Sequence, residues 1–369
     1  MTTLHSLINE LQVDQADKEL HWLTAFIITP EFPQIIEALQ ICSNLLLYNS
    51  PQHPNASKHV ERGPVIKLPV SSSKSEALKG IIVRDGAYIT QLTVTLKEHH
   101  FNKHITRLHL KKPILLPQII TAKKAIDSSI EIIEGLTKLT DCSDADHQKL
   151  IDSFNDLLSN IITAKNALQL PTDPDLVFPI NKSPADAFEP ELLPCIAVDL
   201  YITQAEVCID LKSLHKVTER PWGEIEATSG KSYIDKIRDE MKLPSASASM
   251  ASTTTSEISH PLNVSDIEKR LNEMTGHKEK SFTEPSAPAG ILTNMMTSMS
   301  HLSLRPKHDP IDYITKCVTY NNMVVMINKK IEVSSADPVL VSAFTKLDSI
   351  EYLVSSFISN LDSLVGTLK

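Results

Sequence analysis

Glycine is scarce in this sequence, with 9 among 369 residues. A dinucleotide-binding fold needs glycines where its backbone meets the pyrophosphate, and no GxGxxG run is present. Gly230-Lys231-Ser232 resembles the end of a phosphate-binding loop, but the position that requires the upstream glycine holds Ile225. We therefore predict a loop or a helix terminus at residues 230–232, and we expect no cofactor.

Cysteine is also rare and follows no metal-binding or disulfide pattern. The five cysteines are Cys42, Cys142, Cys195, Cys208 and Cys317. None has CxxC spacing, and the odd number leaves a thiol without a disulfide partner, which is typical of a reducing compartment. Neither HExxH nor GxSxG occurs in the chain. We expect a cytosolic or nuclear protein with no catalytic residue and no metal site.

An excess of basic residues and a long apolar run are both lacking. Lys and Arg total 36 against 45 Asp and Glu, giving a net charge of -9, so nucleic acid is not an expected partner. No window holds the roughly 18 uncharged apolar residues of a spanning helix, and no basic region precedes an apolar N-terminal stretch. We expect no signal peptide, and membrane association only of a peripheral kind.

Apolar residues at helical spacing dominate both ends of the chain and its middle. They predict helices over 4–47, 114–138, 145–169 and 338–368. Pro30 should interrupt the first helix, and the two middle helices should pack antiparallel. In the last helix the heptad positions are Leu347, Ile350, Val354, Phe357, Leu361, Leu364 and Leu368. They predict a seam for another helix, either in the same chain or in a partner's coiled coil.

Between these helices the apolar period changes to two, which predicts antiparallel strands. The regions concerned are 65–110, 195–216 and 322–334. Asp85-Gly86 supplies the positive φ angles of a hairpin turn in the first region. The second is expected to turn near Thr203-Gln204, although an amphipathic helix over residues 205–216 fits the same residues. We expect the third to turn at Asn328-Lys329-Lys330.

Residues 243–308 are rich in Ser, Thr, Met and Pro, and we predict that they are disordered. Within them, Ser265-Asp-Ile-Glu268 has the capping-box pattern and predicts one short helix. The segment Ile291–Leu302 is more apolar than its surroundings and is either a linker or a peptide that binds a partner.

The segment Lys97–His109 concentrates His99, His100, His104 and His109. A solvated strand edge is the favoured interpretation. A basic contact for an acidic partner or anionic lipid, tuned by pH through histidine, and a metal site are the alternatives. Trp22, Trp222 and Tyr201 are candidate binding anchors, although core packing is expected for each; the partner-binding residues are otherwise unknown.

The order of elements and four stretches resemble the Rogdi leucine-zipper family, whose fungal members form the small subunit of the RAVE complex. These stretches are Glu19–Leu23, Leu78–Leu96, Leu192–His215 and Glu332–Phe357. The resemblance implies an elongated α+β protein with two discontinuous domains. An antiparallel helical bundle would comprise 1–48, 113–170 and 336–369, and a small antiparallel β domain 64–112, 192–240 and 317–335. Residues 243–308 would be an insertion.

The resemblance also implies a function by binding alone. The expected role is to promote assembly of the vacuolar H⁺-ATPase by bridging a large WD-repeat, rabconnectin-like subunit and the peripheral ATPase sector, together with a Skp-type adaptor. The expected location is the cytoplasm, with peripheral recruitment to vacuolar and endosomal membranes. A coiled-coil adaptor or tether in membrane trafficking is the alternative function.

Overall fold

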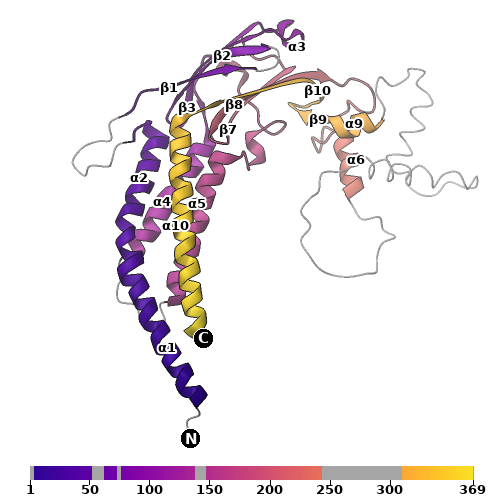
Figure 1. Cartoon of the computed structure of the whole chain (residues 1–369). Helices are drawn as coiled ribbons and strands as arrows, with labels where there is room; N and C mark the ends of the chain where they lie inside the picture. Colours follow the sequence, from indigo (N-terminus) through magenta and orange to yellow (C-terminus); the bar gives the residue numbers. More distant parts are fainter. Residues whose placement is uncertain (1–3, 52–61, 73–75, 138–146, 243–309, 369) are drawn as a thin grey trace, which may run out of the picture. The chain divides into compact units, whose positions relative to one another are not determined.

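The computed structural model describes residues 4–51, 62–72, 76–137, 147–242 and 310–368 (Figure 1). Its helices are α1 (Leu4–Trp22), α2 (Phe32–Tyr48), α3 (His99–Asn102), α4 (Pro117–Leu136), α5 (His147–Gln169), α6 (Tyr233–Lys242), α9 (Pro310–Lys316) and α10 (Pro338–Leu368). A π-helix, η1 (Leu23–Ile28), and a 3₁₀-helix, η2 (Thr29–Glu31), join α1 to α2. Cys142 and the predicted features within 243–308, including the capping box and Ile291–Leu302, lie outside the described residues.

The strands form two antiparallel sheets, so the predicted α+β class is confirmed. The six-stranded sheet contains β1 (Ile66–Ser71), β2 (Leu78–Asp85), β3 (Tyr88–Leu96), β4 (Arg107–Leu110), β5 (Ile114–Leu115) and β6 (Phe188–Glu189). Its order is β1-β2-β3-β4-β6, with β5 paired to β3. The four-stranded sheet has the order β7-β8-β10-β9. Its strands are β7 (Ile196–Thr203), β8 (Glu206–Lys216), β9 (Cys317–Tyr320) and β10 (Met323–Ala336).

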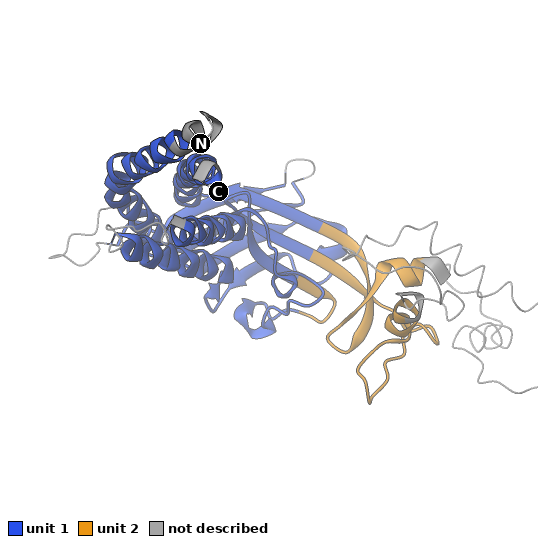
Figure 2. Ribbon diagram, turned by 90° about the horizontal axis from the view of Figure 1, so that it is seen from below, with its two compact units in different colours: residues 1–192, 198–211, 331–369 blue, residues 193–197, 212–330 orange. Residues whose placement is uncertain are grey.

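The chain divides into two compact units (Figure 2). Unit 1 contains Met1–Leu192, Val198–Leu211 and Ile331–Lys369, and unit 2 contains Leu193–Ala197 and Lys212–Lys330. Unit 1 includes both the long helices and the six-stranded sheet. The separation into a helical domain and a β domain therefore stays a prediction.

The long helices of unit 1 pack side by side around an apolar core (Figure 1). α4 and α5 pack against each other, as predicted, and α10 packs against α1, α2 and α5. The Phe154 ring of α5 lies between Phe32 of α2 and Phe357 of α10, at 6.1 Å from each ring centroid. The heptad seam of α10 is buried from Leu347 to Leu361, so it packs within the chain.

A tight turn joins β2 to β3 and rests on the end of α2. The predicted hairpin is confirmed, but its turn residues are Gly86 and Ala87, because Asp85 still pairs with Tyr88 at the end of β2. Of the predicted Asp85-Gly86 pair only Gly86 has a positive φ angle, +59°. A Cβ atom on Gly86 would lie 2.3 Å from the Leu47 carbonyl oxygen, so a side chain would collide with the helix backbone. This glycine permits both the turn and the contact between sheet and helix.

A buried ion pair connects the same hairpin to the first turn of α10. The Arg84 guanidinium donates to both Asp337 carboxylate oxygens, at 2.6 and 3.2 Å, and to the Gly86 carbonyl at 2.6 Å. Asp337 also accepts the backbone N–H groups of Val339 and Leu340, which caps the helix. Both charged side chains have 0% exposure, and their full hydrogen bonding offsets the desolvation.

The buried Gln118 side chain joins α4 to α5 and β7. Its amide nitrogen donates to the Ile202 carbonyl at 2.8 Å and the Ala167 carbonyl at 2.9 Å. Its amide oxygen accepts the Ile202 N–H at 2.7 Å. The side chain thus satisfies backbone groups of a helix end and a strand that would otherwise be buried without partners.

The four-stranded sheet corrects one sequence prediction and settles another. Gln204 and Ala205 have positive φ angles and turn β7 into β8, so the hairpin predicted near Thr203-Gln204 is confirmed, and the alternative helix is wrong. The hairpin predicted at Asn328-Lys329-Lys330 is also wrong, because β10 runs through these residues without a break. The turn lies earlier, at Asn321 and Asn322, where asparagine tolerates the left-handed conformation.

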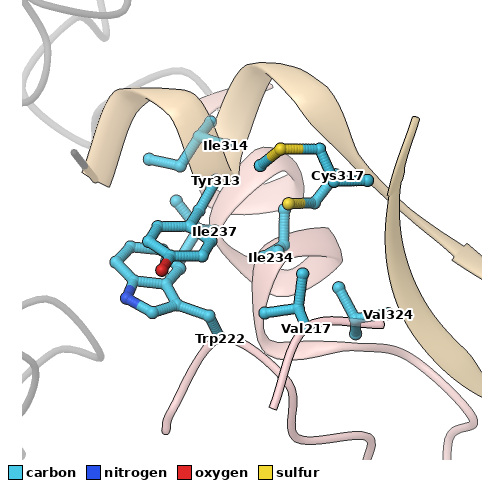
Figure 3. Close-up of a cluster of buried hydrophobic side chains, with 9 residues drawn as sticks. Val217, Trp222, Ile234, Ile237, Tyr313, Ile314, Cys317 and Val324 are labelled. Carbon is cyan, nitrogen blue, oxygen red and sulfur yellow. The ribbon is translucent and has the colours of Figure 1, made fainter. Parts of the chain in front are cut away.

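Unit 2 has its own small core (Figure 3). Trp222 stacks on Tyr313 of α9, with 4.8 Å between ring centroids and 6° between planes. The predicted loop or helix terminus at Gly230–Ser232 is confirmed, because Ser232 caps α6. Its hydroxyl accepts the Asp235 N–H at 3.1 Å, and the Asp235 carboxylate accepts the Ser232 N–H at 3.1 Å.

Candidate functional site

The N-terminal helical segment exposes large apolar side chains. Leu11 is 61% exposed, Trp22 55% and Phe26 66%. Leu11 and Trp22 are three helical turns apart and Trp22 and Phe26 one turn apart, so they share one side of the helix. We call these three residues the N-terminal face. Exposed aromatic residues at helical spacing are typical of surfaces that bind another protein.

The π-helix η1 explains why apolar residues face outward here. The buried positions Leu20, Leu23, Ile28 and Phe32 have spacings of three, five and four residues, where an α-helix would alternate three and four. The extra residue turns Phe26 and Ile27, which are 66% and 40% exposed, away from the core. Sequence spacing predicts Phe26 and Ile27 on the buried side, so that prediction is wrong. π-Helical turns often mark functional sites.

Charged side chains of both signs lie near the N-terminal face. Lys18, seven positions after Leu11 and four before Trp22, lies on the same side of α1 and is paired with Asp14 at 2.6 Å. Asp17 and Glu19 are also exposed on α1. Glu19 accepts a hydrogen bond from Gln15 at 2.9 Å. An apolar centre among charged and polar side chains is typical of a surface that binds another protein.

A shallow groove of about 280 Å³ lies between α2 and α10. It is lined by Glu31, Gln34, Ile35, Ala38, Lys346, Ser349, Ile350 and Leu353. Tyr352, which precedes the lining residue Leu353 in the chain, is 80% exposed. The groove is open to solvent, and its lining contains charged, polar and apolar side chains. Its size is suited to a single side chain of a partner.

The His-rich segment forms the connection between β3 and β4. His99, His100, His104 and His109 are all exposed, but the predicted strand edge is wrong. The segment between β3 and β4 contains α3, and β4 pairs with both β3 and β6, so it is not an edge strand. His109 lies in β4 opposite Thr93, whose hydroxyl is 3.1 Å from its Nδ1. Within the part of the chain that the structure describes, no three His, Cys, Asp or Glu side chains converge as metal ligands.

Two of the other candidate anchors are packed inside the protein. Trp222 is 1% exposed in the unit 2 core, and Tyr201 is 6% exposed with its hydroxyl donating to Glu332 at 2.8 Å. Core packing was predicted for both and is confirmed. For Trp22 the same prediction is wrong. Its neighbours Leu20 and Leu23 are buried, but Trp22 projects from the other side of α1.

The buried thiols of Cys42 and Cys317 are unreactive as nucleophiles. Burial raises the pKa of the Cys42 thiol to about 12 and that of Cys317 to about 11. Both therefore stay protonated at neutral pH, and neither supplies a thiolate nucleophile.

Comparison with known proteins decides the family. The family model described as "Rogdi leucine zipper containing protein" matches residues 19–362. The chain belongs to the Rogdi leucine zipper family. It is also 24% identical to "Regulator of V-ATPase in vacuolar membrane protein 2" of Saccharomyces cerevisiae, over 94% of this chain and 91% of that protein.

The match to the Rogdi family spans most of the features above. It includes Trp22 and Phe26, the His-rich connection and the α10 seam as far as Leu361. In this member of the Rogdi family the zipper-like spacing of α10 serves packing within unit 1. No helix among the described ranges is both long and apolar enough to cross a membrane.

Proposed function

We propose that this Rogdi family member is a non-catalytic subunit of a RAVE-like complex that promotes assembly of the vacuolar H⁺-ATPase. The observation that carries the proposal is similarity along nearly the whole chain to a yeast protein named as a regulator of that ATPase. Since the similarity to the yeast protein covers 94% of the chain, it includes residues of both units.

The mechanism we propose is bridging. The chain would hold a large WD-repeat, rabconnectin-like subunit and the peripheral ATPase sector together, with a Skp-type adaptor in the same complex. Simultaneous binding raises the effective concentration of one partner near the other, so assembly is promoted with no chemical step. The chain would act from the cytoplasm and be recruited to the surface of vacuolar and endosomal membranes.

The N-terminal face supports this mechanism. Trp22 and Phe26 provide rigid apolar area of the kind that dominates protein interfaces. We assign the face to another protein of the complex, one with a complementary apolar patch.

Mass spectrometry of proteins that copurify with the tagged chain, before and after glucose withdrawal, tests the proposal. We expect a WD-repeat protein and peripheral-sector ATPase subunits in the wild-type sample. The double variant Trp22→Glu, Phe26→Glu should lose one of them, whereas Tyr88→Glu, at an exposed aromatic residue of β3, should lose neither. Recovery of tethers or coiled-coil proteins without ATPase subunits would contradict the proposal.

The trafficking adaptor is less well supported. It requires the α10 heptad positions to be open to a partner's helix, and Leu347, Val354 and Leu361 are at most 1% exposed inside unit 1. A partner could reach them only after the bundle had opened.

A further inference from the structure

The β3–β4 connection is strongly basic in a chain whose net charge is -9. Nine exposed basic side chains lie within residues 97–112: Lys97, His99, His100, Lys103, His104, Arg107, His109, Lys111 and Lys112. Glu98 is the one acidic residue in this range. We call residues 97–112 the cationic loop. Such a local concentration of one charge in an acidic protein creates a positive surface potential.

Buried apolar residues hold the cationic loop in a fixed conformation. Phe101, Ile105 and Leu108 are at most 2% exposed. The Phe101 carbonyl accepts backbone N–H groups of His104 and Ile105, each at 2.8 Å, and the Leu96 N–H donates to Thr106 at 2.9 Å. The apolar residues face inward, and the basic side chains project into solvent from a preorganised backbone.

Acidic neighbours neutralise only part of this charge. Lys97 is paired with Glu76 at 2.8 Å, Lys112 is paired with Asp186, and Glu189 lies opposite His109. Lys103, Arg107 and Lys111 form no ion pair with a residue that the structure describes. The loop therefore keeps a positive charge at neutral pH.

We propose that the cationic loop is the surface through which this protein contacts an anionic membrane. Protein interfaces depend on a few large apolar or aromatic anchors, and the loop exposes no large apolar side chain. A phospholipid headgroup layer needs only clustered positive charge, with each Lys or Arg contributing independently. The contact is electrostatic and superficial, and nothing inserts into the hydrocarbon.

This inference deepens the proposed function, on which it rests, because a subunit that acts at the vacuolar surface needs a means of recruitment there. Glu76, Glu98, Asp186 and Glu189 are the carboxylates that lie near the loop and reduce its net positive charge.

Cosedimentation of the purified full chain with vesicles tests the proposal. We expect binding to phosphatidylcholine vesicles containing phosphatidylserine, none to pure phosphatidylcholine, and weaker binding as salt rises. The variant Lys103→Gln, Arg107→Gln should bind about thirtyfold more weakly. The matched variant Lys67→Gln, Lys124→Gln, at exposed residues of β1 and α4, should bind like the wild type.

Two results would overturn the proposal: equal binding of the loop variant and its control, or binding of soluble polyglutamate without binding of anionic vesicles. The second result would assign the loop to an acidic protein. Because the assay uses purified chain, its failure leaves the copurification test of the proposed function untouched.

Discussion

The buried Arg84–Asp337 pair shows how a single residue joins distant parts of unit 1. The two residues are 253 positions apart, and both side chains are inaccessible to solvent. Arginine suits this position because its planar fork donates to both carboxylate oxygens and still reaches the Gly86 carbonyl. Lysine could not make all three contacts.

Arg84→Met should strongly destabilise the protein, because it leaves the Asp337 carboxylate buried without its cation. We expect a loss of about 3–5 kcal/mol in the free energy of unfolding, measured by urea denaturation. Lys79→Met, on the same strand but exposed, is the control and should change it by less than about 0.5 kcal/mol. Equal losses in both variants would show that the pair has no special part in stability.

Asp235 gives unit 2 a dependence on pH. Burial alone would raise its pKa, but hydrogen bonds from Thr319 and Ser232 outweigh burial and lower it. A lowered pKa means that the folded state favours the ionised carboxylate. The resulting stability is present above the ordinary aspartate range and is lost as pH falls through the lowered pKa.

Asp235→Asn should therefore remove part of the acid sensitivity of unit 2. Trp222 reports on this unit, and Trp22→Phe makes it the sole tryptophan, since the chain has two. We expect the Asn variant to be less stable at neutral pH and to lose less stability on acidification, as followed by Trp222 fluorescence during urea unfolding. Parallel pH profiles for both proteins would contradict this account.

Residue-level predictions failed where local spacing was ambiguous. Trp22 follows Leu20 by two positions and precedes Leu23 by one, so it lies off the apolar stripe that these two residues mark, although core packing was expected for it. Trp222 has no periodic context either, yet it is buried by Tyr313, a residue 91 positions away that brings it into a core. Such contacts arise only once the chain has folded.

At the scale of elements, the π-helix η1 is the main departure from regular structure. Thr29 closes it with two hydrogen bonds to the Thr24 carbonyl, one from its N–H and one from its hydroxyl at 2.8 Å. Between Leu23 and Ile28 the buried positions are five residues apart, one more than in an α-helix. The extra residue in η1 absorbs this shift, so Ile28 and Phe32 still lie in the core. Pro30 follows at once and would disfavour a regular continuation.

Deleting Ala25 should remove the π-turn and leave the bundle intact. The spacing from Leu23 to Ile28 becomes four, which an ordinary α-helix accommodates, so we expect stability within about 1 kcal/mol of the wild type. Deleting Gln40 from the regular helix α2 is the control, and it should destabilise strongly by rotating the later apolar residues out of the core. Urea unfolding distinguishes them, and a large loss for the Ala25 deletion would contradict this interpretation of η1.

Element predictions succeeded where period and turn residues agreed. The middle helices form as predicted, and so does the hairpin of β2 and β3, although its turn residues are Gly86 and Ala87, one position later than predicted. The third hairpin failed because Asn328-Lys329-Lys330 looked like a turn although these residues are the exposed stretch of a long strand. The Asn321-Asn322 pair carried the true turn signal.

At the scale of the molecule, the α10 seam distinguishes an internal zipper from an oligomerisation helix. Leu361 is 1% exposed inside the bundle, whereas Tyr352 on the same helix is 80% exposed. Sequence spacing alone left both arrangements open, because an intramolecular and an intermolecular seam require the same heptads.

Leu361→Asp should unfold the bundle, since it buries an unpaired carboxylate among apolar residues. We expect loss of helical circular dichroism and a lower unfolding midpoint, with the wild type monomeric in sedimentation equilibrium. Tyr352→Asp is the matched control on the exposed side of α10 and should remain folded. A wild-type dimer that Leu361→Asp converts to folded monomer would instead establish an intermolecular zipper.

The α+β class and most elements could be predicted from the sequence, but the candidate binding surface could not. Within the N-terminal face, the exposure of Phe26 depends on a single extra residue in η1, and the groove depends on the pairing of α2 with α10. The sequence shows the cationic loop as a cluster of basic residues. The burial of Phe101 and Ile105 in the structure is what shows that the basic side chains face solvent.

The most direct test of the central claim is the amount of peripheral-sector ATPase bound to isolated vacuolar membranes. Cells lacking this chain should retain little of it, and the wild-type chain should restore it. The Trp22→Glu, Phe26→Glu variant, expressed at the same level, should fail to do so. Equal amounts of bound peripheral sector with and without the chain would contradict a role in assembling the ATPase.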